Sequence, residues 1–355
     1  MIALAAAGGV VLAGVIAHGA WQARRAGPKR AEAAAVAEPA GAIEPTFDAA
    51  PLATDEPREA ADDAAAPLRP ARRQPPRIDA LIDAITTLTL DAPVSGDVLL
   101  PQLPPSRRAG AKPLLVEGLN ADSGEWEPIS PSTSSGQRYG ELQAAVQLAN
   151  RGGPLNEIEY SEFVQKVQAF AEAAGAMADF PDMLEIVARA RELDAFAGAH
   201  DAQLAVRLQA RSAAWSVGYL QQHASRHGFV AGGLPGRLVL PGDGDGAPPV
   251  LTLSYDAQAA LAALSGDSPA QAALRNVTLA FDVPQTDPTA APFTAWQASA
   301  QALSLGMDAA IVDDNGQPLT APGFAAIGAE LQRLYDALAE RDLAAGTPAA
   351  RRLFS

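Results

Sequence analysis

The chain has 355 residues, 48% of them apolar, which is long enough for one or two globular domains with a sizeable core. Its formal net charge is −15. This excess of carboxylates argues against a nucleic-acid-binding protein, because phosphate contacts require surplus Lys and Arg. The sequence contains no cysteine, which excludes disulfides, thiolate chemistry and zinc-thiolate sites.

An apolar stretch opens the chain. Residues 1–23 contain no Asp, Glu, Lys or Arg, and about twenty residues at helical rise span roughly 30 Å, the thickness of a bilayer core. A cleaved signal peptide is the alternative, but it needs basic residues before the apolar stretch. Basic residues instead follow it at once: Arg24, Arg25, Lys29 and Arg30. We therefore predict an uncleaved single-pass transmembrane anchor, with its N-terminus outside and the remaining domains in the cytoplasm.

The composition changes over residues 24–77. This stretch is rich in Ala, Pro, Glu and Asp and sustains neither a helical nor a strand period. It buries too little apolar surface to offset the entropy lost on ordering, so we predict a disordered, acidic linker stiffened by proline. Basic residues gather near its end, and we interpret them as a linker boundary rather than as a binding motif: Arg69, Arg72, Arg73 and Arg77.

Residues 78–201 are predicted to form an α+β domain. A run of high β propensity marks its first strand, and Gly175 marks a helix end because it follows the last apolar residue of a helical pattern. The predicted elements are, in chain order, a strand at Ile85–Leu90, a short helix from Asp97, a hairpin joining Leu114–Val116 to Trp126, a strand at Leu142–Leu148, and helices over Phe163–Ala174 and Met183–Leu193.

Residues 202–345 form a second predicted domain, and residues 346–355 a short tail. The strongest signals are an alternating strand at Asn276–Pro284 and an Asn-Gly turn at Asn315–Gly316, typical of a hairpin. The other predicted elements are strands at Gln203–Leu208, Arg237–Leu240 and Val250–Tyr255, and helices over Ala214–His227, Phe293–Leu303 with a C-cap at Gly306, and Ile327–Leu338.

The two predicted domains share an order of elements. Leu142–Gly175 gives a strand followed by a helix, as does Val277–Gly306, and a further amphipathic helix follows each pair. Two interpretations remain: a degenerate tandem pair of one fold, or one larger domain in which similar pieces occur by chance. In both we expect an α+β fold whose antiparallel sheet has helices on one face, because the helices are too few to cover both faces.

Candidate catalytic and metal sites are weak. His223 and His227 have the i, i+4 spacing of helical metal ligands, but no carboxylate pattern accompanies them. The Gly-Asp alternation at Gly242–Gly246 lacks the bidentate Glu of a calcium loop, and Asp313–Asp314 beside Asn-Gly are ordinary turn residues. No nucleophile elbow, P-loop or dinucleotide fingerprint is present. We therefore expect no enzyme, no metal site and no cofactor.

Alternation along the strands of the second domain assigns side chains to the two faces of its sheet. The core face is predicted to carry Leu204, Val206, Leu208, Leu238, Leu240, Leu251, Leu253, Leu279, Phe281 and Val283. The open face is predicted to carry Gln203, Ala205, Arg207, Val239, Val250, Thr252, Thr278 and Ala280. Apart from Gln203, the open-face residues are the candidate peptide-binding site, a shallow apolar trough with Arg207 at its rim for a carboxylate. The alternative is a sheet face that is merely solvated.

The last part of the chain resembles the FtsZ-binding domain of ZipA-type cell-division proteins. The resemblance lies in Val277–Pro284, in Ala298–Gln301, in Asp308–Asp314 with Pro318–Thr320, and in the closing helix. It implies an adaptor anchored in the inner membrane, with a periplasmic N-terminus. Such an adaptor binds the C-terminal tail of FtsZ, the tubulin-like division protein, on the open sheet face and tethers the division ring to the membrane.

This chain departs from the family in the groove. Where the family has a phenylalanine, this chain has Ala280 beside Thr278, so we expect a shallower trough. The alternative function is an envelope-associated protein-interaction module of the same fold that no longer binds FtsZ. A third class, a sheet that binds RNA, is disfavoured because the open face lacks stacking aromatic and basic residues. The sequence does not fix the oligomeric state.

Overall fold

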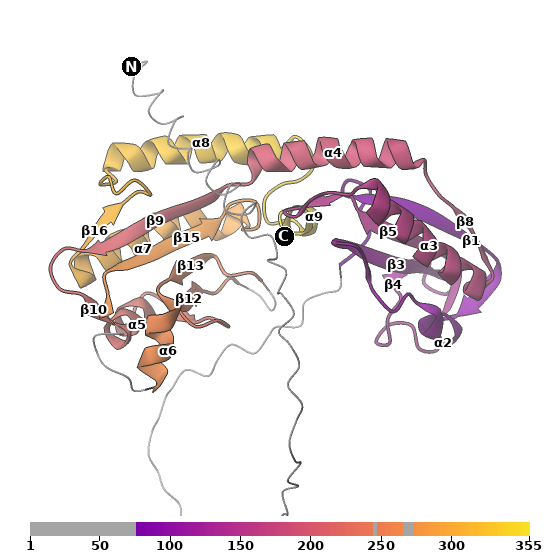
Figure 1. The fold of residues 1–355 in the computed structure, drawn as a ribbon, viewed down its shortest axis with the longest axis horizontal. Coiled ribbons are helices and arrows are strands. Elements are labelled where there is room, and N and C mark those ends of the chain that lie inside the picture. The colour runs from indigo at the N-terminus through magenta and orange to yellow at the C-terminus, as the bar shows by residue number, and fades with distance from the viewer. Residues whose placement is uncertain (1–75, 244–246, 266–272) are drawn as a thin grey trace, which may run out of the picture.

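The structure, a computed structural model, describes residues 76–355 apart from 244–246 and 266–272. The predicted anchor at 1–23 and all of the predicted linker before residue 76 lie outside the described residues. Within the described part of the chain, no helix is long and apolar enough to cross a membrane. The fold is α+β, with two antiparallel sheets and their helices arranged side by side (Figure 1).

The first sheet is antiparallel throughout. In order across the sheet, its strands are β2 (Arg108–Ala109), β3 (Lys112–Asn120), β5 (Arg138–Gln147), β1 (Asp83–Ser95) and β8 (Ala176–Asp179), with β4 (Trp126–Pro128) paired to β3. The predicted hairpin between β3 and β4 is confirmed. The side chain of Asn120 closes its turn by accepting the backbone N–H groups of Asp122 and Ser123 at 2.9 and 3.2 Å.

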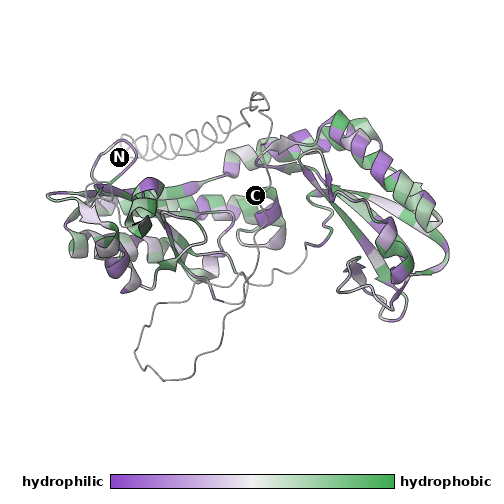
Figure 2. Cartoon of the chain, turned by 60° about the horizontal axis from the view of Figure 1, so that its bottom comes forward, coloured by the Kyte–Doolittle hydropathy of each residue, from purple (hydrophilic) through white to green (hydrophobic). Residues whose placement is uncertain are grey.

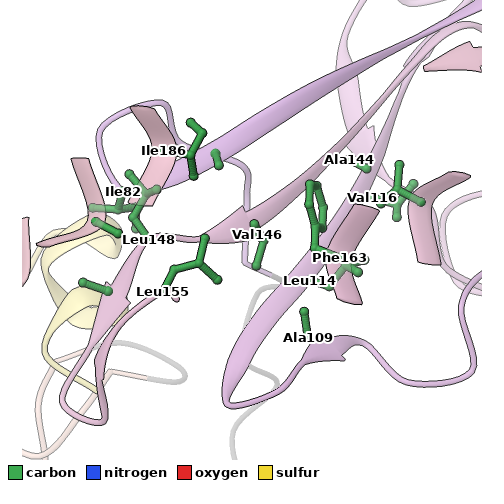
Figure 3. Close-up of a cluster of buried hydrophobic side chains, with 14 of the residues drawn as sticks. Ile82, Ala109, Leu114, Val116, Ala144, Val146, Leu148, Leu155, Phe163 and Ile186 are labelled. Carbon is green, nitrogen blue, oxygen red and sulfur yellow. The ribbon is translucent and has the colours of Figure 1, made fainter. Parts of the chain in front are cut away.

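Helices cover one side of this sheet. They are α2 (Gly96–Leu99), followed by the 3-10 turn η1 (Leu100–Gln102), and then α3 (Glu157–Ala174) and α4 (Met183–His200). The small hairpin of β6 (Ala149–Asn150) and β7 (Gly153–Pro154) precedes α3. The Asn156 side chain caps α3 at its start, and Gly175 ends it at φ 69°, as the sequence predicts. Figure 3 shows Phe163 of α3 beside Leu114 and Val146 of the sheet, all of them buried.

The second sheet is also antiparallel. In order across the sheet, its strands are β11 (Val230–Ala231), β12 (Arg237–Leu240), β13 (Leu251–Ser254), β15 (Asn276–Asp282), β9 (Gln203–Ala210) and β16 (Ala309–Val312). A separate pair joins β10 (Trp215–Ser216) to β14 (Ala273–Leu274). The predicted hairpin after β16 forms only in part, because its second arm makes a single bridge, between Val312 and Pro318.

The helices of the second unit pack on its core face. They are α5 (Val217–Ser225), α6 (Ala257–Ser265), α7 (Pro292–Met307), preceded by the 3-10 turn η2 (Pro288–Ala290), and α8 (Ala321–Ala339). The predicted C-cap at Gly306 is wrong, since α7 continues to Met307 and Asp308 adopts the left-handed cap at φ 50°. The extra residue buries the Met307 side chain in the core. Figure 2 shows hydrophobic and hydrophilic residues interspersed along the outer helices, as amphipathic elements require.

The two sheets place corresponding strands in the same order. The order β3-β5-β1-β8 in the first unit matches β13-β15-β9-β16 in the second. The helices match as well, since α3 follows β5 as α7 follows β15, and α4 follows β8 as α8 follows β16. In Figure 1, α4 and α8 lie along one side of the molecule with their C-terminal ends together. At that meeting point the Arg341 guanidinium lies 3.3 Å from Glu192 and 4.9 Å from the Phe196 ring centroid.

The C-terminal segment returns to the first unit. The sequence suggests a tail at residues 346–355, but the structure forms α9 (Pro348–Leu353) and buries it in the first core. Thr347 caps this helix, and Leu353 and Phe354 are 0 and 1% exposed. Thr347-Pro348 is a typical helix start, and Leu353 and Phe354 give the helix an apolar end. The core residues against which this helix packs lie far away in the sequence.

An ion pair holds the returning segment in place. The Arg352 guanidinium donates to both carboxylate oxygens of Asp83 at 2.6 and 2.8 Å, and the Asp83 side chain is fully buried. Burial raises the pKa of Asp83 above its usual value, although Arg352 acts to lower it. A second ion pair joins the units, since Arg151 donates to Asp201 at 2.5 Å and to Asp282 at 2.7 Å. The two units are therefore fastened by charges as well as by apolar packing.

Candidate functional site

The predicted open face of the second sheet is organised in rows across the strands. One row runs through residues that are directly opposite each other in the register, and we call it the apolar row: Val230, Val239, Thr252, Ala280 and Ala205. The next row along the strands is the arginine row: Arg237, Ser254, Thr278 and Arg207. Six of the seven predicted site residues lie in these two rows.

The helices lie on the other face. The residues predicted for the core face all belong to the second hydrophobic core or pack against it. No residue of the apolar row or the arginine row belongs to that core. The alternation that separated the two faces is therefore confirmed for β9, β12, β13 and β15.

Val250 is the exception among the predicted site residues. It was assigned to the open face by alternation with Thr252, but it is buried and belongs to the core cluster. The regular strand β13 begins only at Leu251, so the period of two does not extend back to Val250. Its backbone N–H still donates to the carbonyl of Leu240 at 2.9 Å, which places Val250 where the chain enters the sheet.

The floor of the face is made of small side chains. Val239 is 9% exposed and Ala280 is 8% exposed, whereas Ala205, Thr252 and Thr278 are half-buried. Little apolar area is therefore available in the middle of the trough, and a bound peptide would gain most of its contact at the sides. This agrees with the shallow trough expected from Ala280.

Arginines mark both ends of the arginine row. Arg237 is exposed and Arg207 is half-buried. Among the residues that the structure describes, none accepts a hydrogen bond or ion pair from either guanidinium. Arg237 was not among the residues predicted for the open face, although it alternates with the predicted Val239 along one strand.

The corresponding face of the first sheet has the opposite charge. Its matching row, which we call the carboxylate row, consists of Glu117, Gln143, Thr87 and Asp179. The Glu117 carboxylate is only 2% exposed and is already occupied. It accepts the Arg77 guanidinium at 2.7 Å, the Ile78 backbone N–H at 3.0 Å and the Gln143 amide at 3.1 Å. The chain therefore lies across this face just before β1 begins.

The other sequence candidates have structural roles. The His223 ring packs against the Tyr219 ring with centroids 4.4 Å apart and the ring planes tilted by 45°. Within the described ranges, no group of His, Asp or Glu residues could hold a metal ion. Asp313 closes a turn by accepting the N–H groups of Asn315 and Gln317 at 2.9 and 2.8 Å. Part of the Gly242–Gly246 stretch lies outside the described residues.

A small apolar crevice lies beneath α8, at the ends of β9 and β15. Its lining residues are Ala202, Leu204, Val283, Ile327, Glu330, Leu331 and Leu334. The one charged member is Glu330, which pairs with Arg333 on the same helix. Apolar walls without a converging polar group give no orientation to a ligand, so the open face remains the stronger candidate.

No family model matches this sequence, and no curated protein matches it either. Its function is therefore inferred from its own residues and their geometry.

Proposed function

We propose that this chain is a membrane-anchored, non-enzymatic adaptor of bacterial cell division. It binds the C-terminal tail of FtsZ on the open face of the second sheet and tethers the division ring to the inner membrane. Three features support the proposal: the apolar N-terminal stretch, the acidic linker, and the resemblance of the last part of the chain to ZipA-type proteins. The observation that carries it is the apolar row, which crosses the open face from β11 to β9.

The geometry of that face suits an extended peptide. The apolar row crosses neighbouring strands that are about 4.8 Å apart, so it offers a strip of roughly 19 Å from Val230 to Ala205. An extended peptide of about six residues covers that length. Burial of apolar side chains supplies the affinity of such a contact, at roughly 25 cal/mol per Å² before the cost of ordering the peptide.

We also propose that the two units are a tandem pair of the ZipA-like fold with different roles. Their corresponding strands share one order, but their open faces differ in occupancy. The Arg77 segment occupies Glu117, at one end of the carboxylate row of the first unit. The first unit then acts as a support that holds the second, and peptide binding belongs to the second unit alone.

The test must use the whole chain. A fragment of residues 203–355 would leave α9 without the first core that buries it. Full-length protein is therefore titrated with a fluorescently labelled peptide of the FtsZ C-terminal tail, and anisotropy is measured. Ala280→Glu and Val239→Glu each place a charge in the apolar row, and we expect them to abolish binding. Ala188→Glu, on an exposed position of α4, is the matched control and should bind as the wild type.

A second candidate function has one observation in its favour. Val239 and Ala280 expose so little surface that the trough offers a weak anchor for a large apolar side chain. The same fold would then serve an envelope-associated interaction that does not involve FtsZ. Depleting the protein in cells distinguishes the two functions, because misplaced or missing division rings support the FtsZ adaptor and normal rings support the alternative.

A further inference from the structure

We propose that the arginine row is a two-point clamp that selects an acidic, extended peptide segment. Arg207 and Arg237 are the two points of the clamp, and Ser254 and Thr278 lie between them. The inference deepens the proposed function and rests on it, since it names the charge pattern of the partner that this face accepts.

The spacing of the arginines sets the spacing of the acidic groups. Arg237 on β12 and Arg207 on β9 are separated by three strand-to-strand steps, through β13 and β15. At about 4.8 Å for each step, their backbones lie roughly 14 Å apart. An extended peptide rises about 3.3–3.6 Å for each residue, so four residues span the same distance. Side chains at positions i and i+4 of such a peptide point to the same side, and both reach the sheet.

Neither charge has a counter-ion among the described residues, and the two are distinguished from other unpaired arginines, such as Arg226, by sharing one row of the open sheet face. Arg77, Arg151 and Arg352 each pair with a carboxylate that is buried or half-buried. Arg207 and Arg237 have no such partner among the described residues, although the whole chain carries a net charge of −15. Arg207 is half-buried on the sheet, and arginines in such positions characteristically pack the aliphatic stem on the protein surface and keep the guanidinium in water.

The rest of the row suits the backbone and the middle of a peptide. The hydroxyl groups of Ser254 and Thr278 provide donors and acceptors between the two arginines. The apolar row lies two residues further along the strands, about 7 Å away, within reach of apolar side chains of the same segment. We therefore expect an acidic residue at each end of a short apolar core. A single-stranded nucleic acid is a poorer fit, because neither row contains an aromatic side chain on which a base could stack.

The test compares two synthetic peptides that differ only in charge. One contains the core Glu-Ala-Val-Ala-Glu and the other Gln-Ala-Val-Ala-Gln, each with the same neutral flanking residues and a fluorescent label. Anisotropy is measured with the full-length chain at low salt. We expect the Glu peptide to bind about tenfold more tightly than the Gln peptide, an advantage that two partly exposed charge pairs can supply. The advantage should shrink as salt is added.

Arginine variants locate the effect. Arg207→Gln and Arg237→Gln should each remove part of the preference for the Glu peptide, and the double variant should remove it entirely. Arg226→Gln removes the same charge from the helical side of the second unit and should change nothing. Unchanged melting temperatures show that the variants remain folded. The clamp is refuted if wild-type protein binds both peptides equally, if it binds neither, or if the double variant keeps the preference.

A parallel titration with the FtsZ tail peptide separates this inference from the proposed function. Tail binding that survives the double arginine variant overturns the clamp and leaves the adaptor function intact. Arginine-dependent binding of the Glu peptide without any binding of the FtsZ tail supports the clamp and overturns the FtsZ partner.

Discussion

The open faces of the two sheets carry charges of opposite sign, on strands that do not correspond. The first sheet carries Glu117 on β3 and Asp179 on β8, whereas the second carries Arg207 on β9 and Arg237 on β12. The strand order beneath them is the same, and in both units the buried apolar residues lie on the opposite face. On the first face Glu117 is paired with Arg77 of its own chain, whereas the arginines of the second face have no partner among the described residues. In the proposed function, one fold then provides a structural support in the first unit and a binding surface in the second.

The two units also differ in how they are completed. The second core is built from residues within the stretch 202–331. The first core takes residues from the far end of the chain, including Leu338, Leu343, Leu353 and Phe354. The first core therefore depends on a segment that the chain supplies last. The second core contains none of that segment, and the second unit meets it through hydrogen bonds, such as the one from the Gln285 amide to the Phe354 carbonyl at 2.6 Å.

Deletion of residues 347–355 should have the largest effect on stability, and it tests whether the two units differ in their dependence on the C-terminal segment. The deletion removes the buried Leu353 and Phe354 side chains and the partner of Asp83, a loss of more than about 5 kcal/mol for the first unit. Hydrogen exchange should then speed up in β1, β3 and β5 while β9, β13 and β15 stay protected. Equal loss of protection in both units would show that they are not separately stabilised.

Arg352→Ala tests the buried ion pair at the same junction. It leaves the Asp83 carboxylate buried without its counter-ion, which costs about 3–5 kcal/mol at neutral pH. Arg352 lowers the pKa of Asp83, so its loss raises that pKa further above the usual value. Below the raised pKa the carboxyl group is neutral, and the cost of the substitution should shrink as the pH falls.

Thermal unfolding across pH measures this cost. Arg341→Ala is the control, because Arg341 and Glu192 are half or more exposed, and it should cost less than about 1 kcal/mol. A penalty for Arg352→Ala that is the same at acid and neutral pH would contradict the assignment to Asp83.

Glu117→Gln tests whether the Arg77 segment is held on the first open face. The substitution removes a charged acceptor of both the Arg77 guanidinium and the Ile78 N–H group, and we expect a loss of about 1 kcal/mol because Arg77 is 54% exposed. Trypsin should cleave after Arg77 faster in this variant than in the wild type. Asp179→Asn, in the same row but away from Arg77, should leave the cleavage rate unchanged.

Reversing the charges of the second face should have the smallest effect on stability. Arg207→Glu combined with Arg237→Glu gives it acidic ends like those of the first face, and the free energy of unfolding should change by less than about 0.5 kcal/mol at these surface positions. The peptide preference should reverse, so that a peptide with Lys at both ends of the core binds more tightly than its Glu counterpart. An unchanged preference would show that charge at these positions does not select the ligand.

Local signals in the sequence identify much of this fold. Gly175 ends α3 and Asn120 closes a turn because each acts on its own neighbours through a few backbone contacts. Alternation along β9 and β15 separates the two faces correctly, since the period of two is a property of one strand. It fails at Val250, where the strand has not yet begun.

Contacts between distant residues are beyond such signals. Arg352 pairs with Asp83, and Arg77 with Glu117, only when the chain has folded. No local sequence pattern near these residues predicts which residue each of them pairs with. The burial of Phe354 depends in the same way on the first core. For the candidate site, alternation placed Arg207 on the open face, but Arg237 was left out of the predicted face although the predicted strand Arg237–Leu240 contains it. That the two arginines share one row follows from the register of β12, β13, β15 and β9.

Hydrogen exchange with and without the FtsZ tail peptide tests the central claim most directly, because it reports on both open faces in one experiment. The full-length chain is exchanged with peptide in excess, and protection is compared strand by strand. We predict slower exchange in β12, β13, β15 and β9 of the second sheet and no change in β3, β5 and β1 of the first. Protection of the first sheet, or of neither, would contradict the assignment of tail binding to the second unit.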